Sequence, residues 1–252
     1  MKTIRVKEVV LDEGRPKICV PIVAHTADEA VVQAKAIQAQ RAYVDLVEWR
    51  ADWLDFDGSW DACFPAAKAI AEQLTGLPLL FTFRTAKEGG AREPAQEVYL
   101  SLTEKAVRSG LFDLVDIELS AGAENVKPLL ETAHERGVFA VCSSHDFCCT
   151  PSKEELLARM AQMDALGADI LKIAVMPQAP EDVLRLLEVT QEISRRTEKP
   201  LITMAMSELG LISRLGGGVF GSCITFGTVG AASAPGQISA VKLREMLDLL
   251  YT

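Results

Sequence analysis

The sequence lacks any apolar run long enough to cross a membrane. Of its 252 residues, 49% are hydrophobic, but no stretch approaches the roughly 18 consecutive apolar residues that a membrane-spanning helix needs. The opening residues, MKTIRVKEVVLDEGRPK, carry a charge every few positions and contain no apolar core of a secretory signal. These absences predict a cytoplasmic protein with no membrane partner.

The cysteines lack the spacing of a zinc site. None forms a CxxC motif, and the adjacent pair Cys148 and Cys149 has no second pair in register. Four of the six cysteines lie in or beside apolar runs, where a reduced thiol behaves as a small hydrophobic side chain. No cofactor motif is present either, so we expect neither a bound metal nor a cofactor.

The chain also lacks the positive charge that nucleic acids attract. It has 26 lysines and arginines against 35 acidic residues, which gives a formal net charge of −9. This balance argues against nucleic acid as a partner. It leaves room for a small anionic substrate, because a few clustered arginines can override the overall charge locally.

Eight strand-like apolar runs alternate with amphipathic helical runs. The runs lie at 17–23, 43–50, 77–84, 113–119, 138–147, 170–177, 199–207 and 222–227. Such alternation predicts a parallel sheet, and eight units in a chain of this length predict one (β/α)8 barrel domain over residues 1–252. Residues 3–14 are expected to form an N-terminal β-hairpin that covers the barrel bottom. A doubly wound open sheet is the alternative, but no GxGxxG motif follows the first strand.

Several helix ends are predicted from single residues. Thr26 or Asp28 is expected to cap the first long helix, because short polar side chains accept hydrogen bonds from free backbone N–H groups there. In the segment 151–167, Pro151 is expected in the first helical turn and Gly167 at the end of the helix.

Lys172 stands in the middle of the apolar run ILKIAVMP. Lysine is rarely buried without a partner, so this one could lie on a sheet edge or extend its stem to the surface. In a mostly apolar barrel, burial would instead favour the neutral amine, which attacks ketones to form a Schiff base.

Other polar residues fall at the predicted C-terminal ends of strands, where barrel enzymes place their active sites. His145 could move a proton near neutral pH, with Glu88 orienting its ring, and arginines could grip a carboxylate. Each has a structural alternative, such as an ion pair between Glu48 and Arg50. The glycine-rich segment 227–239 is predicted to form a lid. Together these residues predict a Schiff-base lyase acting on a small, anionic, hydroxylated ketone.

The sequence resembles the type I 3-dehydroquinate dehydratases along nearly its whole length. The stretches that carry the resemblance are VEWRAD, FTFRTAKEGG, SSHDF, LKIAVMP, MSELGLISR with FGSCITFG, and ASAPGQI. The resemblance implies a hydro-lyase of the shikimate pathway and aromatic amino acid biosynthesis. Such an enzyme removes water from 3-dehydroquinate to give 3-dehydroshikimate, through an imine on lysine. The resemblance also implies a homodimer.

The resemblance further implies roles for nine residues of this chain. Lys172 would form the Schiff base, His145 would act as general acid and base, and Glu88 would pair with that histidine. Six further residues would bind the substrate: Glu48, Arg50, Arg84, Arg214, Ser233 and Gln237. Among these, Arg214 would grip the carboxylate, with the two residues of SAPGQ closing over it.

Two other functions remain open from the residues. A class I aldolase also uses a strand lysine in a barrel, and the glycine-rich GGGVFG at 216–221 could serve its phosphate site. A non-catalytic sugar-acid sensor would keep the same pocket and bind the same ligand without turnover.

Overall fold

Eight parallel strands form the centre of the molecule. The computed structural model describes residues 3–55, 63–230 and 238–251. The strands are β3 (Lys17–Ile22), β4 (Leu46–Arg50), β5 (Leu79–Thr82), β6 (Leu114–Glu118), β7 (Phe139–Asp146), β8 (Ile170–Val175), β9 (Leu201–Ala205) and β10 (Ile224–Phe226). They pair in the order β10-β3-β4-β5-β6-β7-β8-β9, and all neighbouring pairs are parallel. The predicted barrel, rather than an open sheet, is therefore confirmed.

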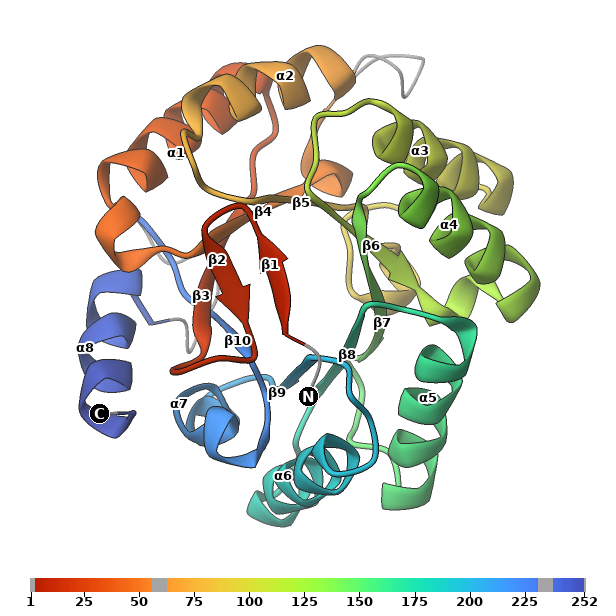
Figure 1. Cartoon of the computed structure of the whole chain (residues 1–252), viewed down its shortest axis with the longest axis vertical. Coiled ribbons are helices and arrows are strands. Elements are labelled where there is room, and N and C mark those ends of the chain that lie inside the picture. The colour runs from red at the N-terminus through yellow and green to blue at the C-terminus, as the bar shows by residue number, and fades with distance from the viewer. Residues whose placement is uncertain (1–2, 56–62, 231–237, 252) are drawn as a thin grey trace.

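The sheet closes on itself between its first and last strands. The amide of Cys223, just before β10, donates to the carbonyl oxygen of Leu201 at 2.7 Å, and Leu201 also forms a parallel bridge with Ser222. Figure 1 shows the resulting ring of strands with the helices outside it. These helices are α1 (Ala27–Ala39), α2 (Cys63–Gln73), α3 (Gln96–Arg108), α4 (Ala123–Glu135), α5 (Lys153–Leu166), α6 (Pro180–Ser194), α7 (Leu211–Phe220) and α8 (Ala240–Leu250).

Strand alternation sorts the side chains into two layers. Trp49 of β4 and Ile173 of β8 point outward and pack with the helices in the larger hydrophobic cluster. Glu48 and Lys172, on the opposite parity, point into the barrel. The alternation of apolar and polar residues along each strand therefore decides which side chains reach the interior.

The N-terminal hairpin closes the bottom of the barrel, as predicted. Strands β1 (Ile4–Val6) and β2 (Val9–Leu11) pair antiparallel across it. Ile4, Val6 and Leu11 belong to the inner apolar cluster, together with barrel residues such as Leu80 and Val141. Burial of these side chains holds the hairpin against the strands and covers the bottom of the barrel. Figure 1 shows the hairpin lying across the ring of strands.

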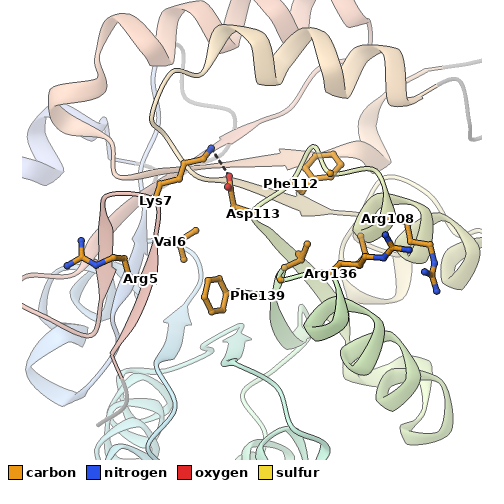
Figure 2. Close-up of a pocket in the computed structure, with 12 residues that line it drawn as sticks. Arg5, Val6, Lys7, Arg108, Phe112, Asp113, Arg136 and Phe139 are labelled. Atoms are coloured by element: carbon orange, nitrogen blue, oxygen red, sulfur yellow. Dashed lines mark ion pairs between the residues drawn. The ribbon is translucent and has the colours of Figure 1, made fainter.

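A cavity of about 410 Å³ lies beside this hairpin. It is lined by hairpin residues and by the turns that lead into β6 and β7, with Lys7 2.8 Å from Asp113 in an ion pair (Figure 2). Since these turns precede the strands, the cavity opens at the end of the barrel opposite to the C-terminal ends of the strands.

Local capping residues set the ends of the helices. Thr26 caps α1: its hydroxyl accepts from the amide of Glu29 at 3.2 Å, and the Glu29 carboxylate accepts from the Thr26 amide. Gly167 ends α5 in the left-handed conformation, as predicted. The prediction for Pro151 is wrong. Ser152 is the N-cap of α5 and accepts from the amide of Glu155, so the proline lies one residue outside the helix.

Candidate active site

A cavity of about 590 Å³ opens at the C-terminal ends of the strands. Side chains from β4, β7, β8, β10 and α7, and from the loop after β5, line it. Seven of the nine residues predicted to form the site are among them: Glu48, Arg50, Arg84, Glu88, His145, Lys172 and Arg214. The other two, Ser233 and Gln237, lie outside the described residues.

Lys172 is buried in the barrel between two carboxylates. Its side chain is 3% exposed, and Nζ lies 2.9 Å from Asp116 Oδ2 and 3.5 Å from Glu48 Oε1. Because β8 lies between β7 and β9, the lysine is neither on a sheet edge nor at the surface. The expectation of mostly apolar surroundings is wrong, since two acidic side chains offset the cost of burying the ammonium group.

Arg84 organises the acidic side chains around that lysine. Its guanidinium contacts Asp116 and Glu118 at 2.9 Å each, and it also donates to the Ser143 hydroxyl at 3.0 Å. Burial alone lowers the pKa of Arg84, but Asp116 and Glu118 outweigh it and raise that pKa above its ordinary value. Burial raises the pKa of Asp116, but Arg84 and Lys172 outweigh it and lower that pKa below its ordinary value. Both groups are therefore charged at neutral pH.

Glu88 and His145 form a second polar pair in the lining of the cavity. Glu88 Oε2 lies 2.9 Å from His145 Nδ1 and also accepts from the His145 amide at 2.9 Å. Its other oxygen accepts from the Ser120 hydroxyl at 2.6 Å. With Nδ1 held by the carboxylate, Nε2 is the ring nitrogen left for a ligand in the cavity.

The environment sets the protonation of this pair. Burial raises the pKa of Glu88 to about 7. Burial, helped by the positive charges of Arg84 and Lys172, lowers the pKa of His145 well below its ordinary value. The imidazole is therefore neutral at neutral pH and can accept a proton, which a general base must do.

The loop that carries Glu88 is fixed by close packing. The short 3-10 helix η4 (Ala86–Glu88) ends at Gly89, whose positive φ of 81° is easy only for glycine. A Cβ at Gly89 would lie 2.2 Å from the Phe147 ring, and one at Gly90 would lie 1.7 Å from the carbonyl oxygen of Arg84. Both positions therefore require glycine if Glu88 is to reach His145.

Arg50 is held by its neighbour Asp52 rather than by Glu48. Nε and Nη2 of Arg50 each donate to Asp52 at 2.8 Å, a bidentate pair that fixes the plane of the guanidinium. Glu48 instead accepts from the Thr82 hydroxyl at 2.9 Å and faces Lys172. The alternative of an ion pair between Glu48 and Arg50 is therefore wrong.

Arg214 brings an unsatisfied positive charge to the cavity. Its Nε is buried and has no hydrogen-bond partner, and no ion pair to Arg214 is found in the part of the chain that the structure describes. Burial lowers the pKa of Arg214. The helix that carries it is anchored by Ser213, whose hydroxyl accepts from the Ala205 amide at the end of β9. A half-buried arginine with a free Nε–H donor is suited to bind an anion.

Asp116 and Glu118 were not predicted to belong to this site. They stand two residues apart in the apolar run DLVDIEL, which gives them the same inward parity on β6. Two acids on one face of a buried strand were the signal that could have identified them. Lys172, the partner of Asp116, is 56 residues away in the sequence.

Within residues 3–55, 63–230 and 238–251, no cluster of three or more histidine, cysteine or acidic side chains is arranged to hold a metal ion. No helix among these same residues is long and apolar enough to span a membrane.

Comparison with known proteins points to one family. The family model for type I 3-dehydroquinase matches residues 18–252. The 3-dehydroquinate dehydratase of Salmonella agona is 47% identical over 252 residues, which cover 100% of this chain and 99% of the relative. That of Listeria monocytogenes is 47% identical over 251 residues, with the same coverage.

Solved structures of 3-dehydroquinate dehydratases are also similar to this chain. The type I 3-dehydroquinate dehydratase of Clostridium difficile, solved with covalently modified comenic acid, superposes with a TM-score of 0.95 at 41% identity, covering 99% of this chain and 98% of that one. The 3-dehydroquinate dehydratase of Enterococcus faecalis gives a TM-score of 0.91 at 41% identity, covering 99% of this chain and 100% of that one.

Proposed function

Because the chain belongs to the type I 3-dehydroquinase family, we propose that it removes water from 3-dehydroquinate through a Schiff base on Lys172. The observation that carries the proposal is the position of Lys172 Nζ. It lies inside the cavity on β8, 2.9 Å from Asp116, and the neutral His145 lines the same cavity. An amine and a base facing one cavity are what imine-based elimination requires.

The first step forms the imine. The Lys172 ammonium passes one proton to the neutral imidazole of His145, which lines the same cavity, and the free amine attacks the ketone carbon of the substrate. The ketone oxygen takes one proton from the attacking nitrogen and the other back from His145, and it leaves as water. The product is a positively charged iminium, and His145 is neutral again. The two carboxylates that hold the ammonium in the free protein also stabilise this cation, because they are fixed in place before the reaction begins.

The second step eliminates water. The iminium draws electrons from the neighbouring C–H bond, and the neutral imidazole of His145 takes that proton. The resulting enamine expels the hydroxyl group on the next carbon, which leaves as water with a proton returned by His145. Hydrolysis of the conjugated imine then releases 3-dehydroshikimate and restores the lysine. Glu88 supports both transfers because it fixes the ring of His145 through Nδ1.

The remaining lining residues bind the substrate in this proposal. Arg214 has a free buried donor and takes the substrate carboxylate. Glu48 and Arg50 lie at the end of β4 and take the ring hydroxyls. Arg84 also lines the cavity, but its Nη1 and Nη2 atoms already contact Glu118 and Asp116. In this proposal its main role is therefore to hold those two carboxylates in position rather than to bind the substrate.

A turnover assay with 3-dehydroquinate tests the proposal. Dehydration creates a conjugated enone, whose ultraviolet absorbance grows with time. An aldolase would instead split a C–C bond into two smaller products. A sensor would bind the compound, raise the melting temperature and yield no product. No rise in absorbance at high protein concentration would contradict the proposed reaction.

The structure gives no support to the aldolase alternative. The GGGVFG segment at 216–221, suggested above as a phosphate site, forms the last turns of α7 and its C-cap. Gly218 there approaches Pro16 and Tyr251, near the start of β3 rather than the cavity mouth. The position of this segment therefore does not support a phosphate site there.

We also propose the cellular context that the family suggests. The chain would act in the shikimate pathway, in aromatic amino acid biosynthesis, as a cytoplasmic homodimer. It would fold as a single domain over residues 1–252. Light scattering measures the mass of the particle in solution, and one cooperative unfolding transition is the result expected of a single domain.

A further inference from the structure

The turn after β7 carries two adjacent exposed thiols. Cys148 and Cys149 are exposed, and the other four of the six cysteines are buried. They follow His145 by three and four residues, so the turn that holds them is continuous with the strand that carries the proposed base.

Hydrogen bonds fix the backbone of this turn. Asp146 Oδ1 accepts from the amides of Cys148 and Cys149 at 3.1 and 2.9 Å. The carbonyl oxygen of Cys148 accepts from the Gln178 side chain, and that of Cys149 accepts from the Met176 amide. All four backbone groups of the two cysteines are therefore satisfied. The chain bends at Cys148, so this segment is no longer part of the strand, in which adjacent side chains would point to opposite sides.

Two neighbouring thiols suit a ligand atom that needs only two sulfur donors. A structural zinc ion needs four protein ligands, and the described residues offer no cluster of three or more suitable side chains. A trivalent arsenic atom that already carries one organic group needs only two thiols. Local desolvation and the Asp146 carboxylate raise the pKa of Cys149, which disfavours the thiolate chemistry of oxidation.

We propose that Cys148 and Cys149 form a dithiol site that binds trivalent organic arsenicals. The arsenic–oxygen bond of an arsine oxide breaks and two arsenic–sulfur bonds form. The oxygen leaves as water with the two thiol protons, and no atom changes oxidation state. The second sulfur binds within the same molecule, so two thiols retain arsenic far more strongly than one.

Occupation of this site affects the neighbouring cavity. Phe147, next to the two cysteines, lines the cavity and packs against Gly89 so closely that a Cβ there would lie 2.2 Å from its ring. Gly89 follows Glu88, the partner of His145. A ring closed over the two sulfurs shifts this turn and slows turnover, a consequence that rests on the proposed function.

Native mass spectrometry with phenylarsine oxide tests the binding. We expect one adduct per chain that survives excess glutathione, a monothiol, and is removed by 2,3-dimercaptopropanol. Cys148→Ser and Cys149→Ser should each weaken retention by at least about 100-fold, whereas Cys142→Ala, a change at a buried cysteine, should keep the adduct. An adduct that persists in both serine variants, or one that glutathione strips from the unmodified chain, would overturn the site.

Turnover of 3-dehydroquinate tests the coupling separately. The fully modified protein should lose at least about tenfold in kcat/KM, since small displacements of catalytic groups cost up to ~100-fold. The dithiol should restore it, and Cys148→Ser should be unaffected by the reagent. Full modification with unchanged turnover would overturn the coupling. A protein inactive before treatment would count against the proposed function, while the mass measurement still decides the site.

Discussion

At the scale of single residues, charge balance explains how a lysine can be buried in a barrel. The interior holds the cations Lys172 and Arg84 against the carboxylates of Glu48, Asp116 and Glu118. Each cation contacts at least one carboxylate directly, so neither charge is uncompensated. Arg214 also lines the cavity, and its buried Nε has no hydrogen-bond partner among the described residues.

Arg214→Ala should therefore weaken substrate binding without unfolding the chain. Loss of a charge-assisted contact made through the buried Nε of Arg214 costs on the order of 2–5 kcal/mol, so KM should rise by at least about tenfold. Steady-state kinetics with 3-dehydroquinate measures this. Arg195→Ala, at an exposed arginine after α6, is the matched control and should leave KM unchanged. An unaltered KM in the Arg214 variant would remove that residue from the site.

His145→Ala should slow turnover far more than it weakens binding. A lost general acid and base costs roughly 10²–10⁴-fold in rate, and the imine on Lys172 can still form. Intact mass spectrometry should then show substrate or product attached to the variant. A variant with near-normal kcat would transfer the role of base to another group, Glu88 being the nearest carboxylate.

At the scale of elements, the sequence predicts the strands better than the loops. Glu48 and Lys172 were correctly predicted to point into the barrel. This prediction needs only the sequence of each strand, because alternate side chains of a strand point to opposite faces. The contacts between Asp116 and Lys172 and between Arg50 and Asp52 depend on register and side-chain choice, which no local pattern specifies. Pro151 shows the same limit: it was expected in the first helical turn, but α5 begins after its N-cap Ser152.

The loop after β5 gives a prediction at this scale. Gly90→Ala should displace η4 and its Glu88, because the new Cβ would lie 1.7 Å from a backbone carbonyl oxygen that cannot move aside. We expect a loss of stability of about 1–3 kcal/mol, together with lower kcat. Urea unfolding and kinetics measure both.

Gly216→Ala is the control for that variant. Gly216 lies in α7 with no atom near its added Cβ, so alanine should be neutral or should stabilise the helix by up to about 1 kcal/mol. Equal behaviour of the two variants would contradict the claim that Gly90 is needed for close approach.

At the scale of the whole molecule, the buried charges link folding to pH. The pKa of Asp116 is lower in the folded chain than its ordinary value of 3.8, so the unfolded chain binds more protons between those two values. The stability that Asp116 contributes is therefore present above about pH 4 and is lost as the pH falls through the folded pKa.

Asp116→Asn tests this link. Near pH 6 the variant should be less stable than the unmodified chain by on the order of 3–5 kcal/mol, because two buried cations lose a shared partner. The difference should begin to shrink as the pH falls below about 4, because Asp116 of the unfolded chain then takes up a proton while Asp116 of the folded chain stays ionised. Denaturant unfolding across this range measures it. A difference that is constant with pH would show that the carboxylate charge does not stabilise the fold.

The central claim is that Lys172 forms a covalent imine with the substrate, and borohydride reduction tests it most directly. Reduction during turnover should attach the ligand skeleton to the one peptide that contains Lys172, because borohydride converts an imine into a stable amine. Lys172→Met, which keeps much of the side-chain volume but has no amine, should stay folded, lose activity and escape labelling. Peptide mass spectrometry locates the label. Label on another lysine, or no label while dehydration continues, would contradict the mechanism.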